Sequence, residues 1–132
     1  MKTYRIPFVL VVLIAAALAC QASLSTANIA DAYTTADPNG GSPTTVFAPD
    51  QVFYAIVELK NAPDDTSVKA VWTAVNVEGT EPNTYLTETV LTSGDGTLTF
   101  ELSNNNLWPA GQYKVDLYLN DKLDRTLTLE VR

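Results

Sequence analysis

Apolar and polar residues alternate one by one over much of the chain from residue 44 onward. In the run "VFYAIVELK", for example, Phe53, Ala55, Val57 and Leu59 fall on one side of an extended chain. A repeat of two residues predicts a strand with one buried face. No later segment shows the 3.6-residue repeat of a helix. The pattern therefore predicts an all-β domain.

Clusters of Asn, Asp, Gly and Pro separate the alternating runs about every ten residues, as turns do in all-β domains. Within the run "TYLTETVLT", Leu86 and Val90 would bury Glu88 between them. An unpaired buried carboxylate is costly, so we expect a bulge or a sheet edge at this place. The runs that we predict as strands are residues 52–60, 67–77, 84–92, 97–103, 112–119 and 123–131.

One earlier run, "NIADAYTT" at residues 28–35, is weaker and has two interpretations. It is either a first strand that ends in a hairpin turn at "DPNGG" or part of a linker. In the first case Ile29, Asp31 and Tyr33 would share one side of the strand. In the second case the domain would begin near Thr44.

About seven short antiparallel strands, each with one apolar side, predict two sheets packed face to face. Trp72 lies in the middle of the second long run, and "PAGQYKVDLYL" places Tyr113 at the start of a strand with Val115 two residues later. The latter stretch resembles the tyrosine corner of immunoglobulin-like domains, whose antibody-type members have a cysteine where this chain has Val115. The resemblance covers residues 44–132 and extends to Asn28 if the first strand forms. It implies an immunoglobulin-like antiparallel β-sandwich without the inter-sheet disulfide, and it says nothing about activity.

The N-terminus has the layout of a secretory signal peptide. Lys2 and Arg5 precede fourteen uncharged residues, which are fewer than the about 20 that a spanning helix needs. The triplet Ala17-Leu18-Ala19 would direct ordinary signal peptidase to cleave after Ala19. Followed by Cys20, the same residues resemble the lipobox of bacterial lipoproteins, with the usual order of leucine and small residue exchanged. That resemblance implies a diacylated Cys20 as the new N-terminus.

These expectations divide the chain into three parts. Residues 1–19 are a cleaved signal peptide, residues 20–27 are a lipidated Cys20 with a flexible tether, and residues 28–132 are the β-sandwich with its core in 44–132. We therefore expect an exported lipoprotein of the cell envelope, attached to a membrane through the lipid on Cys20. The alternative is a secreted protein with a free N-terminal thiol.

Charge and composition exclude several functions. Loss of Lys2 and Arg5 with the signal leaves six basic residues against fifteen acidic ones, a net charge of −9. Such a charge opposes binding to nucleic acid, because phosphates are bound through clustered Lys and Arg. The chain has no histidine, and its one cysteine is at the lipidation position. Triads that need histidine or a thiol are thereby excluded.

The remaining polar groups indicate structure rather than chemistry. Ser67 and Lys69 would share a strand face, a spacing that also arises by chance. Acidic residues at "DPNGG", "PDD" and "SGDG" match no calcium-loop spacing and fit the needs of tight turns. We therefore expect no enzyme, no metal and no cofactor.

Two surface hypotheses remain. Trp108 in a loop and Tyr54 on an outer strand face could stack on a sugar, or Trp108 could cap one end of the core. The second hypothesis is an interaction face, since an unusually apolar outer sheet surface favours docking of a second copy or of another envelope protein. A bulge that buries the valines is its alternative. The residues expected on this face are Ile56, Val71, Val75, Val77 and Tyr118. The leading function is thus a non-catalytic interaction or structural module, and carbohydrate or small-ligand binding is the alternative.

Overall fold

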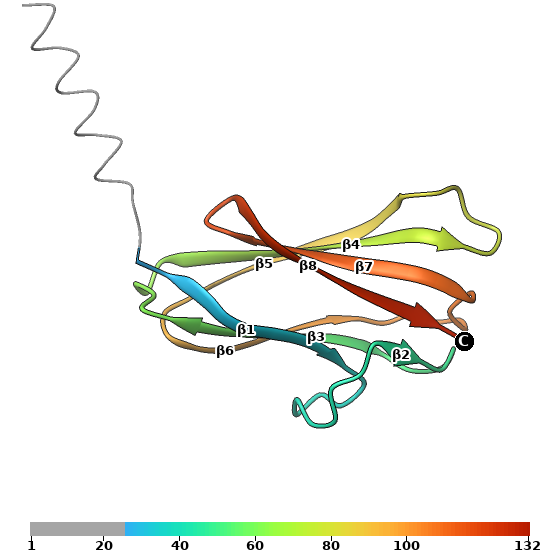
Figure 1. The fold of residues 1–132 in the computed structure, drawn as a ribbon, viewed down its shortest axis with the longest axis horizontal. Coiled ribbons are helices and arrows are strands. Elements are labelled where there is room, and N and C mark those ends of the chain that lie inside the picture. Colours follow the sequence, from blue (N-terminus) through green and yellow to red (C-terminus); the bar gives the residue numbers. More distant parts are fainter. Residues whose placement is uncertain (1–25) are drawn as a thin grey trace, which may run out of the picture.

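The computed structural model describes residues 26–132, so the predicted signal peptide, Cys20 and most of the tether lie outside the described residues. The described chain forms two β-sheets packed on each other (Figure 1). One has the strand order β1-β3-β6 and the other β2-β8-β7-β4-β5. This confirms the predicted all-β, two-sheet architecture. The strands are β1 (Asn28–Thr35), β2 (Val46–Phe47), β3 (Phe53–Lys60), β4 (Thr66–Val77), β5 (Thr84–Ser93), β6 (Gly96–Leu102), β7 (Gly111–Leu119) and β8 (Lys122–Val131).

The sheets enclose a core formed by the sides that alternation predicted. Neighbouring strands pair antiparallel, with the exception of β2, which pairs parallel to the end of β8. The only cysteine of the chain is Cys20, so packing rather than a disulfide holds the two described sheets together. The buried members on β3 and β4 include Phe53, Ala55, Val57, Leu59, Val68, Ala70, Trp72 and Ala74.

The weak first strand forms, but a bulge changes its faces. The register of β1 with β3 shifts between Ile29 and Asp31. Ile29 is buried in the core, and beyond the bulge Ala32 packs against the core instead of Tyr33. The expectation that Ile29, Asp31 and Tyr33 share one side is therefore wrong, because the extra residue reverses the alternation.

Strand β5 has both features expected around Glu88. It is an edge strand of the five-stranded sheet, and its pairing with β4 passes from Thr87 directly to Tyr85. Leu86 is the extra residue of this bulge. Leu86 and Leu91 pack against the core, whereas Glu88 is exposed to solvent. The bulge thus lets both leucines reach the core without burying the carboxylate between them.

The segment between β1 and β2 crosses from one sheet to the other. A single bridge joins Thr35 to Pro43, and the chain then pairs with β8 rather than continuing beside β1. The expected hairpin at "DPNGG" is therefore only a one-bridge loop. This loop is fixed by the Tyr33 hydroxyl, which donates to the Gly40 carbonyl at 2.7 Å. It lies over the outward side of β3, where a methyl group at Gly40 would be 3.7 Å from Ile56 Cγ1.

The two ends of the sandwich differ. We call the end at which β1 begins the N-terminal pole; there Thr26 donates to the Asn61 carbonyl at 2.9 Å. We call the opposite end the distal pole (right-hand side of Figure 1). It carries the β4–β5 and β6–β7 loops, joined by a 3.1 Å hydrogen bond from Glu78 to Ala110. No helix among residues 26–132 is long and apolar enough to cross a membrane.

Candidate functional site

Tyr113 forms the predicted tyrosine corner. Its hydroxyl donates to the carbonyl of Pro109, four residues earlier, at 2.6 Å. The ring is buried, and burial raises the pKa of the Tyr113 phenol above 10.0. Trp72 and Val115 are also fully buried on the facing strands β4 and β7, which are directly paired. These residues therefore serve the fold, as the resemblance implied.

Trp108 is part of the core and not of a ligand platform. Its ring stacks on Phe53 with 4.5 Å between centroids and meets Tyr113 edge-on at 5.7 Å. Its Nε1 donates to the Gln51 carbonyl at 2.9 Å, and 8% of the residue is exposed. The ring has no free face for a sugar, so the stacking role proposed for Trp108 is wrong and the core-capping interpretation is correct. Tyr54 lies half-buried on the outward side of β3, opposite to the core-facing side of Phe53 on which Trp108 stacks.

The polar groups singled out in the sequence are engaged in structural contacts. The Lys69 ammonium lies 4.7 Å from the centroid of the Tyr118 ring, a cation–π contact, rather than being held by Ser67. Asp37 accepts from the Asn39 amide at 2.8 Å, and Asp95 accepts from the Ala62 amide at 2.6 Å. In the described part of the chain no three His, Cys, Asp or Glu side chains gather as metal ligands.

The expected interaction face is divided between the two sheets. Ile56 belongs to the three-stranded sheet, is 4% exposed, and lies under the β1–β2 crossover loop. Val77 belongs to β4, but the register with β7 shifts between Ala74 and Asn76, and Val77 joins the core. The expectation that Ile56 and Val77 belong to the interaction face is therefore wrong. A bulge buries Val77, and a loop covers Ile56.

The other three expected residues do share one surface. Val71 and Val75 on β4 and Tyr118 on β7 are half-buried and point outward from the five-stranded sheet. We call the outward side of this sheet the outer face. Val71 lies between Glu88 on β5 and Asp116 on β7, and Lys69 lies between Val90 and Tyr118. The outer face thus mixes apolar side chains with charged ones.

Four more apolar residues extend the outer face. Val90 pairs with Lys69, Tyr85 with Thr73, Leu123 with Tyr118 and Val46 with Glu130, so all four point to the same side as their partners. They are exposed by 53%, 58%, 56% and 40% respectively. Only one other large apolar residue in the described range, Leu107, is as exposed. The bulges of β5 and β8 hid Tyr85, Val90 and Leu123 in the sequence, and the shortness of β2 hid Val46.

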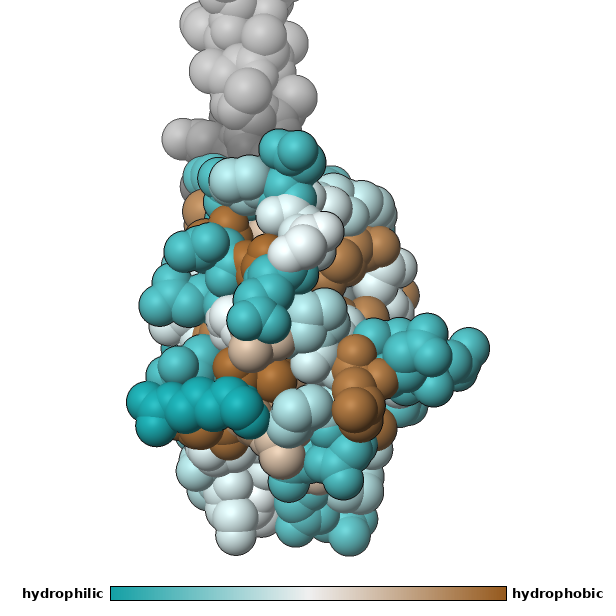
Figure 2. All heavy atoms as spheres, turned by 90° about the vertical axis from the view of Figure 1, so that its right-hand side faces the viewer, coloured by the Kyte–Doolittle hydropathy of each residue, from teal (hydrophilic) through white to brown (hydrophobic). Residues whose placement is uncertain are grey.

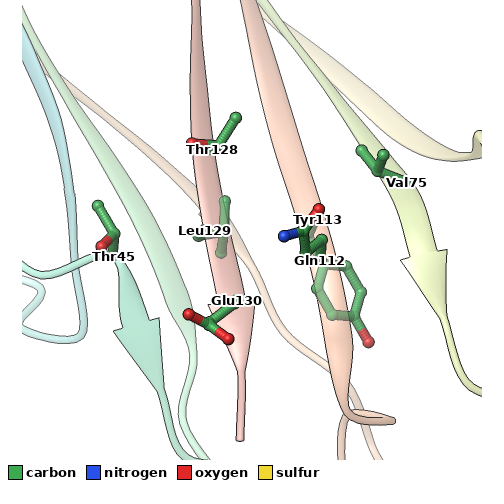
Figure 3. Close-up of a pocket in the computed structure, with 7 residues that line it drawn as sticks. All are labelled: Thr45, Val75, Gln112, Tyr113, Thr128, Leu129 and Glu130. Atoms are coloured by element: carbon green, nitrogen blue, oxygen red, sulfur yellow. The ribbon is translucent and has the colours of Figure 1, made fainter.

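A shallow hollow lies at the distal end of the outer face (Figure 3). Val75 from β4, Gln112 from β7 and Glu130 from β8 line it, together with Thr45 and Thr128. Its volume is about 220 Å³, below the about 300–1,000 Å³ of ordinary small-molecule pockets. It is therefore better suited to receive one side chain of a partner than a free ligand.

The distal pole presents a different surface. Figure 2, which looks onto this end, shows apolar residues in separate small patches among polar ones. Leu107 is 68% exposed in the β6–β7 loop, which belongs to this pole. Single exposed apolar residues of this kind are common on protein surfaces. Most of the strongly exposed large apolar residues in the described range lie on the outer face instead.

Comparisons with known proteins give likenesses of fold. No family model and no curated protein matches the chain. An immunoglobulin-like protein from Pseudomonas aeruginosa is similar with a TM-score of 0.55 and 11% identity, over 83% of this chain and 99% of that one. Alkylpurine DNA glycosylase AlkC of Pseudomonas fluorescens, bound to DNA containing an abasic site analogue, has a TM-score of 0.55 and 13% identity over 83% of this chain.

This chain spans only 31% of the length of that glycosylase. A third similar structure is the C-terminal domain of wzt, with a TM-score of 0.50 and 13% identity, over 83% of this chain and 75% of that one. At such identities the likeness shows the fold and no activity. The strand order, the tyrosine corner and the buried Trp72 agree with it. The described part of this chain is an immunoglobulin-like β-sandwich.

Proposed function

We propose that this chain is an exported lipoprotein whose immunoglobulin-like domain is a non-catalytic module that binds another protein through the outer face. The observation that carries the proposal is the position of the exposed apolar residues. Four of the five most exposed large ones, Val46, Tyr85, Val90 and Leu123, lie on this one side of one sheet. Large apolar side chains that are exposed on one surface favour burial against a partner.

The opposite outer surface supports this choice by contrast. On the three-stranded sheet the crossover loop covers Ile56, and the neighbouring outward positions on β6 are Thr97, Thr99 and Glu101. The two outward surfaces of the sandwich therefore differ in polarity. A partner that buries apolar area gains free energy from the five-stranded side alone.

The tether fits attachment at the N-terminal pole. Five residues, 21–25, separate Cys20 from the first described residue, Thr26, and the six steps from Cys20 to Thr26 span at most about 20 Å when extended. A lipid on Cys20 would therefore hold the N-terminal pole close to the membrane surface. The strands run from this pole to the distal pole, so both the outer face and the distal loops would be accessible from the aqueous side (Figure 1).

The alternative of a carbohydrate-binding module loses its main support because Trp108 is stacked within the core. Tyr54, half-buried on the outward side of β3, offers no second ring to form a platform.

To test the anchor, the wild-type chain and the variant Cys20→Ser are expressed in a bacterial host, where cleavage between Ala19 and Cys20 can be followed. Fatty-acid labelling and detergent phase partitioning of the wild-type chain should show an acylated product, and the variant should show none. A matched control is Ser23→Ala, which leaves Cys20 intact and should be labelled like the wild type. An unmodified wild-type N-terminus in the intact mass would contradict the lipoprotein assignment.

The outer face is tested with Val90→Glu and Leu123→Glu. Both side chains are exposed by more than half, so these variants should fold like the wild type. Val71→Asp is less suitable, because it would place a carboxylate between Glu88 and Asp116. Thr97→Glu on the other sheet is the control. Loss of association, measured by sedimentation with the partner or with a second copy, is expected for the first two variants alone.

A further inference from the structure

A groove separates the two sheets along the side where β1 and β8 are neighbours. We call it the β1–β8 slot. Ala32 and Thr34 line it from β1, Thr44 from the crossover, and Leu127 and Thr128 from β8. Its volume is about 650 Å³, within the about 300–1,000 Å³ range of ligand sites and well above that of the hollow on the outer face.

Hydrogen bonds join the two walls of the slot near both of its ends. At the N-terminal pole, Arg125 reaches across from β8 and its Nη2 donates to the Ile29 carbonyl at 2.6 Å. At the other end the Thr44 amide donates to the Thr34 carbonyl at 2.9 Å, and the Thr34 hydroxyl donates to the Thr44 carbonyl at 2.6 Å. These bonds hold the two walls of the slot in place relative to each other.

The slot lies where a longer β2 would run. Strand β2 pairs with β8 only at Val46–Glu130 and Phe47–Val131. In β8, residues 122–128 have β7 on one side and no described strand on the other. No described strand therefore occupies the position beside Thr126 and Thr128 that a longer β2 would take.

The backbone of β8 has the right orientation to pair in this slot. The amides of Glu130 and Arg132 point toward β2, where they donate to Thr45 and Phe47 at 2.8 and 3.1 Å. Alternate residues of a strand point their N–H and C=O groups the same way. No register shift lies between residues 126 and 130, so the N–H and C=O groups of Thr126 and Thr128 face the slot.

The same argument applies to the β1 wall. The Thr34 carbonyl points away from β3, toward Thr44, so Ala32 two residues earlier also presents its backbone groups to the slot. None of the side chains that line the slot is charged, and Ala32 and Leu127 form its apolar floor against the core. The walls offer main-chain donors and acceptors, and an occupant with an unpaired charge would be penalised.

We propose that the β1–β8 slot binds an extended, uncharged peptide segment of another protein as an added β-strand. Main-chain pairing with β8 supplies its affinity, and the uncharged lining selects its side chains. The chain's own N-terminal segment reaches the fold at Thr26, beyond the Arg125 end of the slot. It would have to reverse direction at Ala27 to enter, whereas a segment of a second protein has no such constraint.

The test uses the full chain purified in detergent and a phage-displayed library of random heptapeptides. Enriched peptides should be uncharged, and on binding they should slow amide hydrogen exchange at Thr126 and Thr128. Thr128→Pro should weaken binding at least tenfold, because it removes a donor that faces the slot and is not part of the β7–β8 ladder. Thr128→Ala keeps the amide and should bind within twofold of the wild type.

A second measurement does not depend on how Thr128→Pro folds. Methylation of alternate backbone amides of an enriched peptide should abolish binding, and methylation of the intervening amides should not. The proposal is overturned if no peptide is enriched, if protection appears on the β5 edge instead, or if methylation shows no alternation. If the chain self-associates and Thr128→Pro abolishes that association, the slot binds a second copy of the chain, and the proposal is overturned as well. Val90→Glu should leave peptide binding unchanged, which separates this site from the outer face.

Discussion

Removal of the Tyr113 hydroxyl isolates the contribution of the tyrosine corner. The change Tyr113→Phe deletes a 2.6 Å hydrogen bond to the Pro109 carbonyl and keeps the buried ring with its aromatic neighbours. A hydrogen bond contributes about 0.5–1.5 kcal/mol net to stability. Pro109 itself is exposed, so water can partly satisfy its carbonyl after the change. We therefore expect a loss of about 1 kcal/mol in the free energy of unfolding.

Urea denaturation followed by tryptophan fluorescence measures this loss. With a slope of about 1–3 kcal/mol per molar urea, the midpoint should fall by about 0.3–1 M while the slope stays the same. The melting temperature should fall by about 4–8 °C. A matched control is Tyr85→Phe, whose hydroxyl is exposed and lies 3.3 Å from Glu88 Oε1. If the two variants lose equal stability, the tyrosine corner does not contribute as described.

Three further outcomes are expected. Burial raises the pKa of the Tyr113 phenol above 10.0, so the folded state keeps the phenol proton to a higher pH than the unfolded state does, and the stability that Tyr113 contributes is lost as pH rises through the raised pKa. The difference in unfolding free energy between the wild type and Tyr113→Phe should therefore narrow above pH 10. A difference that stays constant with pH in urea titrations would contradict this. Gly111→Ala should destabilise by more than about 2 kcal/mol, because a Cβ at this φ of +146° would overlap the Asn76 carbonyl oxygen. Gly79→Ala, where a Cβ meets nothing within 4 Å, should cost about 1 kcal/mol in the same melting assay, and equal losses would refute the contact argument. Val71→Asp should lower stability by about 1 kcal/mol and Val90→Glu by less than about 0.5 kcal/mol. The reason is that Glu88 and Asp116 flank Val71, whereas Lys69 lies opposite Val90. If denaturant titrations give the reverse order, these strand registers are wrong.

The long strands were predictable because their buried faces repeat every second residue. Phe53, Val57 and Trp72 were placed correctly on this basis alone. The tyrosine corner was predictable for a different reason, since Tyr113 and Val115 have a local sequence spacing that the fold requires. Strand β2 could not be predicted, because two residues carry no periodic signal and its parallel partner is more than eighty residues away.

The errors have two physical causes. One is the β-bulge, which turned Val77 inward and brought Leu123 and Tyr85 to the outer face without any clear mark in the sequence. The other is cover by another segment, since Ile56 has an outward position on its strand yet is buried under the loop that contains Gly40, sixteen residues earlier. Burial of Trp108 by Phe53 is of the same kind. The alternation of apolar and polar residues predicts the side of the strand to which a side chain points. It does not predict whether another segment covers that side.

Because no disulfide links the two sheets, the aromatic cluster near the distal pole is an important contact between them. Phe53 contacts the rings of Phe47, Trp72, Trp108 and Tyr113, with centroid separations between 4.5 and 6.2 Å. These residues come from β2, β3, β4, β7 and the β6–β7 loop, so one cluster joins both sheets. The described chain begins at the opposite pole, where Thr26 bonds to Asn61, so the cluster lies away from the point at which the predicted tether would join the domain.

In-cell photo-crosslinking from the outer face tests the central claim most directly. A photoreactive amino acid at Val90, which is 53% exposed, would report what lies against the five-stranded sheet, and the same group at the exposed Thr97 would report the opposite surface. We expect a discrete, saturable protein adduct from position 90 that depends on an intact Cys20, and none from position 97. Equal labelling from both positions, or none from position 90, would contradict an interaction module that works through the outer face.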